Sequence, residues 1–259
     1  MELLQITGIQ TSLHWEDPLK NQAMFEKKLA TIKNTDLVVL PEMFTTGFSM
    51  NTTIATNPGY NPLEWMKIQS KRFGFAIAGS YMIAENGKFF NRLSFVTPSG
   101  EVVSYNKKHL FTLANEQMYY VAGNEQVLVN YKGWKLGLMI CYDLRFPVWC
   151  RRSSTFNYDA LIFVANWPDR RSHAWRSLLL ARAIENQAYV IGVNRVNADG
   201  NGIIHSGDSA MIDPKGKYIN TAFPFKEEMI QASFSHSALQ EVRQRLPFFN
   251  DRDEFEIKS

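Results

Sequence analysis

The sequence has few cysteines, no excess of charge of either sign and no long apolar run. Only Cys141 and Cys150 are present among 259 residues, too few for a disulfide framework or, unless histidines join them, for a structural zinc site. The net charge of +3 is small and the basic residues are scattered, which indicates no nucleic acid and no membrane as partner. No apolar stretch could span a bilayer and no secretory signal opens the chain, so we expect a soluble, cytoplasmic protein.

What is present is typical of a globular α/β protein. Hydrophobic residues make up 45% of the chain, and its length suits one domain, so we predict a single domain over residues 1–259. Strand-like runs alternate with helical patterns, and Asn86-Gly87 marks a tight hairpin, which predicts mixed sheets covered by helices. The expected strands are 3–10, 37–40, 75–84, 88–97, 102–105, 126–130, 135–140, 161–165 and 189–194, with three more near Ile203, Met211 and Met229. The expected helices are 18–32, 62–73 and 171–186, with a further helical segment within 146–157.

Three residues with chemical potential stand at strand ends or in an irregular loop. Cys141 follows a buried strand and precedes a helical segment, a setting that exposes a nucleophile and lowers the pKa of a thiol. Glu42 directly follows another buried strand, where a carboxylate is costly to desolvate without a partner or a function. Lys107 lies in the irregular stretch 106–124, and such stretches inside compact domains are usually functional. Open α/β sheets place their sites at such positions.

Each of these residues also has a purely structural interpretation. Taken alone, Cys141 is explained equally well as a buried core cysteine, and Glu42 as an exposed loop carboxylate. Lys107 and Lys108 fit solvated surface lysines, and His109 fits a hydrogen-bonded structural histidine better than a base or a ligand. The surrounding sequence has to decide.

The surrounding segments resemble one family. Those that contain Glu42, Lys107 and Cys141 are similar to the three signature blocks of the nitrilase, or carbon–nitrogen hydrolase, superfamily, in the family's order. They read Leu40-Pro41-Glu42-Met43-Phe44, Tyr105-Asn106-Lys107-Lys108-His109-Leu110-Phe111 and Cys141-Tyr142-Asp143-Leu144-Arg145-Phe146-Pro147. Similarity to the ω-amidase, or 2-oxoglutaramate amidase, branch extends to Val164-Ala165-Asn166-Trp167-Pro168, Trp175, 181–187, 192–195 and 207–209. One departure is Asn106, where the family usually has arginine, which puts the contacts that support Lys107 in question.

The resemblance implies a fold, an activity and an assembly. The fold is a four-layer α-β-β-α sandwich of two mixed sheets, and the subunits form a homodimer. The activity is a thiol-dependent hydrolysis of the ω-amide of a small 2-oxo dicarboxylic acid monoamide, such as 2-oxoglutaramate or 2-oxosuccinamate, to the dicarboxylate and ammonia. It needs no metal and no organic cofactor, and the biological role it suggests is repair of deaminated glutamine, coupled to methionine salvage. The apolar segment 246–249 would cover the partner subunit or its own core.

The resemblance also assigns catalytic roles to named residues. Cys141 would attack the amide carbon and form a thioester, while Glu42 would move the protons. Lys107, assisted by the backbone N–H of Tyr142, would stabilise the oxyanion. Glu116 matches a second glutamate that would orient Lys107 and the substrate, with a loop carboxylate as the alternative.

Substrate-binding residues rest on weaker signals. Arg171 is the first candidate for binding a distal carboxylate and Arg145 the second, because the guanidinium fork can hold both oxygens. Arg171 is equally explained as a helix surface residue, and Arg145 as a structural ion-pair partner. We expect Tyr142, Trp167 and Phe44 to wall the pocket, with ordinary core packing as the alternative.

Two other functions remain open at this point. One is another activity of the same superfamily, an N-carbamoyl amino acid hydrolase or a nitrilase, with the same triad and a different pocket. The other is a non-catalytic interaction protein on the same fold. The segment Asn166-Trp167-Pro168 favours the ω-amidase, and the intact Glu42, Lys107 and Cys141 argue against loss of catalysis.

Overall fold

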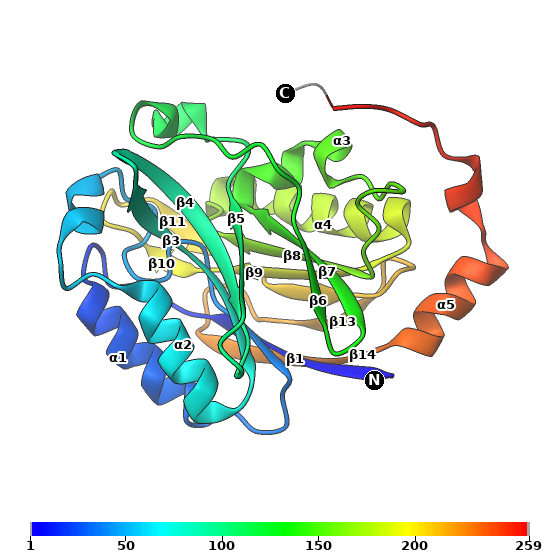
Figure 1. The fold of residues 1–259 in the computed structure, drawn as a ribbon, viewed down its shortest axis with the longest axis horizontal. Coiled ribbons are helices and arrows are strands. Elements are labelled where there is room, and N and C mark those ends of the chain that lie inside the picture. The colour runs from blue at the N-terminus through cyan, green and yellow to red at the C-terminus, as the bar shows by residue number, and fades with distance from the viewer. Residues whose placement is uncertain (1, 258–259) are drawn as a thin grey trace.

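The computed structural model describes residues 2–257 and contains two six-stranded sheets that lie face to face (Figure 1). The first sheet has the order β14-β1-β2-β3-β4-β5, and β2 runs parallel to both of its neighbours while the other pairs are antiparallel. Its strands are β1 (Leu3–Gln10), β2 (Leu37–Val39), β3 (Ala76–Glu85), β4 (Lys88–Val96), β5 (Val102–Asn106) and β14 (Glu228–Ser235). This sheet is mixed, as predicted.

The second sheet has the order β13-β12-β9-β8-β7-β6, with β7, β8 and β9 parallel and the outer pairs antiparallel. Its strands are β6 (Leu128–Tyr131), β7 (Trp134–Ile140), β8 (Ala160–Ala165), β9 (Tyr189–Asn194), β12 (Ala210–Ile212) and β13 (Tyr218–Thr221). A separate two-stranded ribbon joins β10 (Val196–Ala198) to β11 (Ile204–Ser206). Parallel strands bring their carboxyl ends to one edge, which is where a site can form.

Helices cover the outer faces of both sheets (Figure 1). On the first sheet lie α1 (Pro18–Leu29) and α2 (Pro62–Phe73); each begins with proline at the first helical position after a side-chain cap, Asp17 or Asn61. On the second sheet lies α4 (Ser172–Asn186), with the short α3 (Pro147–Cys150) beside it, and α5 (His236–Arg245) follows β14. The layers are therefore α-β-β-α, which confirms the predicted fold class.

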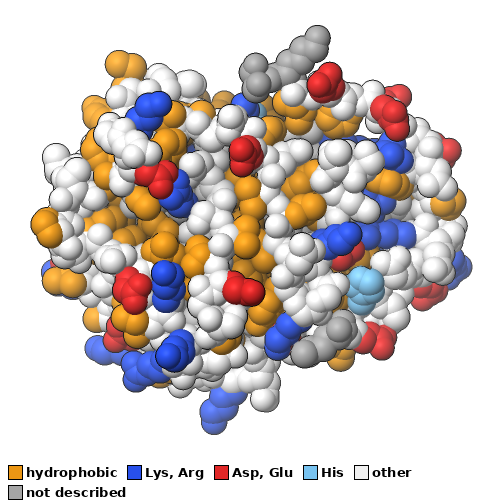
Figure 2. All heavy atoms as spheres, viewed as in Figure 1, with side chains coloured by type: hydrophobic (Ala, Val, Ile, Leu, Met, Phe, Trp, Pro, Cys, Tyr) orange, Lys and Arg blue, Asp and Glu red, His pale blue; other side chains and the backbone are white. Residues whose placement is uncertain are grey.

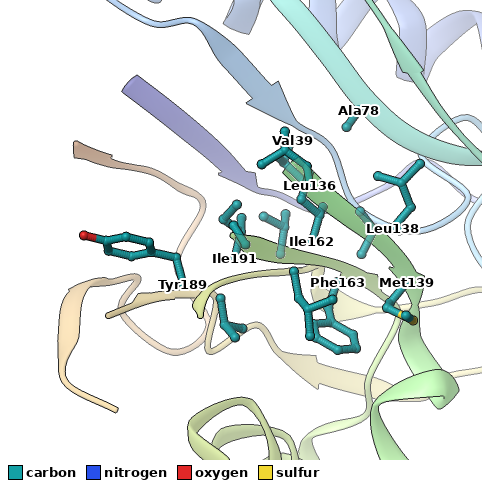
Figure 3. Close-up of a cluster of buried hydrophobic side chains, with 14 of the residues drawn as sticks. Val39, Ala78, Leu136, Leu138, Met139, Ile162, Phe163, Tyr189 and Ile191 are labelled. Atoms are coloured by element: carbon teal, nitrogen blue, oxygen red, sulfur yellow. The ribbon is translucent and has the colours of Figure 1, made fainter. Parts of the chain in front are cut away.

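Alternation along the strands separates the two faces of the first sheet. Val38 and its outward-facing neighbours pack against Phe25 of α1 and Trp65 of α2. Leu37 and Val39 point the other way, toward the second sheet. Figure 3 shows this inner layer, where Val39 and Ala78 of the first sheet meet residues of β7, β8 and β9. Full burial of each such aliphatic side chain contributes about 1.5–3 kcal/mol, so this layer holds the sheets together.

Some elements differ from those predicted. The helical segment expected within 146–157 is confined to α3, because Ser153 turns the chain by accepting the N–H of Phe156 at 3.0 Å. The strand expected near Ile203 is β11, and β10, β13 and α5 have no counterpart in the prediction. Within the described chain, none of the helices is both long and apolar enough to cross a membrane.

Candidate active site

Four strand ends bring the predicted catalytic residues to one place. Glu42 follows β2 and Lys107 follows β5, two strands that run in the same direction in the first sheet. Cys141 follows β7 and Asn166 follows β8, parallel neighbours in the second sheet. All four side chains line one cavity of about 100 Å³. The site therefore lies between the sheets, and each sheet contributes two of these residues.

Lys107 is the cation at the bottom of this cavity. Its side chain is 1% exposed, and its Nζ donates hydrogen bonds to Glu42 Oε1 at 2.9 Å and to Glu116 Oε1 and Oε2 at 3.1 and 3.0 Å. Burial alone would lower the pKa of this ammonium, but the carboxylates of Glu116 and Glu42 outweigh burial and raise it. Lys107 is therefore charged at every physiological pH.

Glu42 is fully buried and held from several directions. Oε1 accepts hydrogen bonds from Lys107 and from Asn91 Nδ2, the latter at 2.8 Å, and Oε2 accepts the backbone N–H of Asn166 at 2.8 Å. The Asn166 side-chain amide also donates to the Glu42 carbonyl at 2.6 Å. These contacts hold the carboxylate in one orientation, and proton transfer to and from a defined atom requires such an orientation.

Asn91 is a site residue that the sequence analysis missed. It lies on β4 and is fully buried, and its backbone carbonyl oxygen accepts a hydrogen bond from the backbone N–H of Lys107 at 2.9 Å. A polar residue on the inward face of a predicted strand is the signal that could have found it. At Asn106, where the family usually has arginine, the side-chain oxygen accepts a hydrogen bond from Arg92 Nε at 2.8 Å. Lys107 is held in register by the backbone carbonyl of Asn91 instead.

Glu116 lies on the far side of Lys107 from Glu42. It is fully buried in a short 3-10 turn, Glu116–Met118, and it also accepts the backbone N–H of Phe111 at 2.5 Å. Burial raises the pKa of its carboxyl group, against the opposing effect of Lys107. The structure thus places Glu116 against Lys107 and against the loop that lines the cavity, so Glu116 is a buried, paired carboxylate within that loop.

Cys141 occupies a sharp turn between β7 and a 3-10 turn, Cys141–Arg145. Its φ of 42° lies in the left-handed region, a strain of about 1–3 kcal/mol that functional residues often carry. Burial and the Glu42 carboxylate raise the pKa of its thiol well above the ordinary value of 9.0, and Lys107 only partly opposes them. The expectation of a lowered pKa is therefore wrong, because a single 3-10 turn and one shared ammonium do not compensate for burial beside a carboxylate.

Asp143 ties the Cys141 turn to the Lys107 loop. Its Oδ2 accepts Tyr105 Oη at 2.7 Å and the N–H of Ile140 at 2.9 Å, and its Oδ1 accepts the backbone N–H of His109 at 3.0 Å. The ring Nδ1 of His109 lies 2.8 Å from the same oxygen. His109 is thus the structural histidine that the sequence indicates, and the buried Asp143, which the sequence analysis missed, is its partner.

The rim of the cavity contains most of the predicted substrate-binding residues. Arg145, Arg171, Tyr142 and Trp167 all line it. The guanidinium of Arg171 lies 5.1 Å from the Phe111 ring, and that of Arg145 lies 4.9 Å from the Trp167 ring. The rest of the rim was not predicted: Phe48, Leu113, Ala114, Pro168, Arg170, and the ribbon residues Asp199, Ile203 and His205.

Phe44 does not line the cavity, so its expected role as a pocket wall is wrong. The ring is fully buried and packs edge-on against Phe25, with 5.6 Å between centroids, and at a tilt of 38° against Trp65, with 5.4 Å between centroids. Its position two residues after Glu42 turns it to the outer face of the first sheet, toward α1 and α2. Within residues 2–257, no three His, Cys, Asp or Glu side chains are grouped so as to hold a metal ion.

Comparison with known proteins agrees with this geometry. Residues 9–244 match the family model described as carbon-nitrogen hydrolase. The chain belongs to this family. Among carbon-nitrogen hydrolases it is 43% identical to the Escherichia coli (strain K12) protein named omega-amidase YafV, over 98% of each chain. It is 34% identical to the 2-oxoglutaramate amidase of Bacillus subtilis (strain 168), over 85% of each.

A solved carbon-nitrogen hydrolase has the same architecture. XC1258 from Xanthomonas campestris, described with an arsenic adduct in its active site, superimposes with a TM-score of 0.95 at 40% identity and covers 100% of both chains. The family and the fold implied by the sequence motifs are therefore confirmed.

Proposed function

We propose that this carbon-nitrogen hydrolase is an ω-amidase, which hydrolyses the terminal amide of a short 2-oxo dicarboxylic acid monoamide such as 2-oxoglutaramate. One observation carries the proposal. A thiol, a carboxylate and an ammonium line a small cavity together with three arginines, Arg145, Arg170 and Arg171, and in the described structure neither Arg145 nor Arg171 forms an ion pair. The names of the omega-amidase and 2-oxoglutaramate amidase relatives support it.

In the first half of the reaction, the enzyme is acylated. The Cys141 thiol is protonated at rest, so Glu42 takes its proton as the sulfur attacks the amide carbon. The carbonyl oxygen becomes an oxyanion, which the Lys107 ammonium and the Tyr142 backbone N–H stabilise. Glu42 then returns the proton to the nitrogen, the C–N bond breaks, and ammonia leaves a thioester on Cys141.

In the second half, water replaces ammonia at the same carboxylate. Glu42 removes a proton from water, the hydroxide attacks the thioester carbon, and Lys107 again faces the oxyanion. Collapse breaks the C–S bond and releases the dicarboxylate, and Glu42 returns the proton to the sulfur. Glu116 keeps Lys107 in place through both halves, because it accepts two hydrogen bonds from the same ammonium.

Arg171 and Arg145 bind the substrate's distal carboxylate in this proposal. Each guanidinium already lies on an aromatic ring, so little side-chain freedom is lost on binding. Burial, together with the neighbouring Arg170 and Arg145, lowers the pKa of Arg171, so a negative charge beside this guanidinium would be favourable. A carboxylate would supply that charge through two parallel hydrogen bonds.

We further propose that the protein forms a homodimer through α3 and α4, the helices beside the site. The family resemblance implies this pairing, and both helices carry exposed apolar side chains. Val148 on α3 is 56% exposed and Ile184 on α4 is 54% exposed. Side chains of this kind are suited to a two-fold interface, where each copy covers the same patch on the other.

The activity is tested by measuring ammonia release from a panel of substrates. The panel is 2-oxoglutaramate, 2-oxosuccinamate, succinamate, an N-carbamoyl amino acid and a simple nitrile. We expect turnover with the dicarboxylic monoamides, its loss in Cys141→Ala and its retention in the matched control Cys150→Ala. Turnover confined to the carbamoyl compound or the nitrile would keep the triad and overturn the ω-amidase, and no turnover at all would favour a non-catalytic protein.

A further inference from the structure

A second cavity, here called the anion cavity, lies apart from the catalytic one and shares no lining residue with it. It has a volume of about 520 Å³ and opens between the β6–β7 turn, the start of β8, α5 and the segment after α5. Its charged and aromatic lining residues are Lys135, Arg152, Asp159, His236, Arg243 and Phe249. Lys and Arg side chains gather beside a histidine on the right of this face in Figure 2, where Figure 1 places α5.

Arg152 is the unusual residue of this cavity. It is only 4% exposed, yet its guanidinium forms neither a hydrogen bond nor an ion pair with any described residue. The guanidinium lies over the Phe249 ring, with 4.2 Å between the guanidinium carbon and the ring centroid. A buried, uncompensated charge is costly, and proteins normally satisfy it with a counter-charge. Asp159 attracts the Arg152 guanidinium electrostatically, but that carboxylate is already paired with Arg243 and forms no ion pair with Arg152.

Asp159, the carboxylate in the cavity wall, already has hydrogen-bond and ion-pair partners. Asp159 accepts Arg243 Nη1 at 2.9 Å and the backbone N–H of Lys135 at 3.0 Å, and His236 Nε2 lies 3.8 Å from it. Arg243 is engaged too, since its other nitrogens donate to backbone carbonyls. The Lys135 side chain is exposed and forms no ion pair within the described chain. Among the described residues, Lys135 and Arg152 are therefore cations of this cavity that form no ion pair.

We infer that the anion cavity binds a small, doubly charged oxyanion, with Arg152 and Lys135 as its principal ligands. A guanidinium and an ammonium that line one cavity match the charge of a phosphate or of a short dicarboxylate. The side-chain amides of Gln240 and Asn250 can donate further hydrogen bonds to its oxygens. Phosphate and dicarboxylate share this chemistry, and the experiment separates them.

The test is a titration of the intact protein with inorganic phosphate, followed by calorimetry. We expect saturable binding that weakens at least about tenfold in Arg152→Gln and in Lys135→Glu, since each removes a charge-assisted hydrogen bond. The matched control is Lys88→Glu, the same charge reversal at an exposed residue beginning β4, and it should bind phosphate like the wild type. Lys135 is exposed, so its variant tests the site even if Arg152→Gln unfolds.

An active-site control is needed because the catalytic cavity also contains arginines. Arg171→Gln should leave phosphate binding unchanged. Loss of binding in Arg171→Gln with retention in Arg152→Gln would place the anion in the catalytic cavity and overturn the inference. Absence of saturable binding by both phosphate and succinate would overturn it as well.

Succinate, titrated in the Arg171→Gln background, identifies the source of the anion. If succinate binds and Arg152→Gln abolishes that binding, the site takes a dicarboxylate of the product's class. If phosphate alone behaves in this way, the site takes free phosphate. Either result supports an oxyanion site.

Discussion

At the scale of single residues, the decisive relation is between Cys141 and Glu42. Burial and the Glu42 carboxylate raise the pKa of the thiol, which in the proposed mechanism Glu42 has to deprotonate. A free thiolate would be reactive toward any electrophile that enters the cavity. With a raised pKa, the proton leaves only when an amide carbon is in place to accept the sulfur, so nucleophile activation and substrate binding are joined in one step.

The first prediction concerns the pH dependence of thiol alkylation. The thiol's pKa in the folded protein is raised above 9.0, so the thiolate fraction at Cys141 keeps growing as the pH rises through 9. The rate of Cys141 labelling by iodoacetamide should therefore increase through that range without levelling. Cys150, fully buried and also with a raised pKa, should stay unlabelled in the folded protein. Peptide mapping after labelling checks both, and a plateau below pH 8 would contradict the raised pKa.

Replacing Glu42 separates its two effects. Glu42→Gln removes the base, so turnover should fall by about a hundredfold or more. It also removes the negative charge that raises the thiol's pKa, so iodoacetamide should label Cys141 faster than in the wild type at the same pH. Stopped turnover with faster labelling is the expected pair of results. Slower labelling would show that the carboxylate does not act on the thiol through its charge.

The residues themselves differ in how well sequence revealed them. Glu42, Lys107 and Cys141 each follow a strand directly and stand in distinctive segments, so pattern and resemblance both indicated them. Asn91 acts through its side chain on Glu42 and its backbone on Lys107, and a single asparagine inside a strand carries no motif. Phe44 was misplaced because a short motif does not show which side of the sheet its aromatic ring faces.

At the scale of elements, the Cys141 turn and the Lys107 loop form one unit. Asp143 accepts hydrogen bonds from both, and the His109 ring stacks on Phe146 with 3.6 Å between centroids. The catalytic cysteine and lysine come from different sheets, so their relative position depends on this bridge. Asp143 is therefore a positioning residue, which acts on the chemistry through the two segments it joins.

The corresponding prediction is that Asp143→Asn lowers kcat at least tenfold while KM for 2-oxoglutaramate changes little. Both carboxylate oxygens of Asp143 accept hydrogen bonds, so the NH2 group of an asparagine would face a donor and form no hydrogen bond with it. Each buried group left unsatisfied in this way costs about 1–3 kcal/mol of stability. The turn and the loop should then separate, moving Lys107 from the oxyanion. Steady-state kinetics on protein shown to be folded by circular dichroism measures this.

The matched control is Asp213→Asn. Asp213 also accepts backbone N–H groups, those of Lys215 and Lys217, but in the turn between β12 and β13. The Asp213→Asn variant should keep the kcat of the wild type. A fall in thermal stability of Asp143→Asn with unchanged kcat would show that Asp143 supports the fold and not the geometry of catalysis.

The elements also show where sequence patterns stop being informative. Helix α1 was predicted from the apolar residues on one of its faces, and α2 from its cap and first-turn proline, which are local signals. Strands β10 and β13 have only 3 and 4 residues, too few for an alternation to be recognised. The long helical segment after Cys141 was overpredicted, because tertiary contacts of Arg151 and Arg152 with the end of α4 hold that stretch extended.

At the scale of the whole molecule, α4 connects the site with the outer surface. Arg182 of α4 donates from Nη2 to the carbonyl of Leu144 at 2.6 Å, inside the turn that carries Cys141. Ile184, two residues along the same helix, is 54% exposed. A partner that covers α4 would therefore hold the helix that supports the nucleophile, which gives the proposed dimer a catalytic consequence.

The last prediction tests that consequence. Ile184→Glu places a charge in the proposed interface, where a carboxylate would be desolvated without a partner, and light scattering should show monomers. The matched control is Ile68→Glu, because Ile68 is also 54% exposed but lies on α2, on the other side of the sandwich. It should remain dimeric. If α4 needs its partner, the Ile184→Glu monomer should also lose kcat, whereas a fully active monomer would show that Arg182 holds the Cys141 turn unaided.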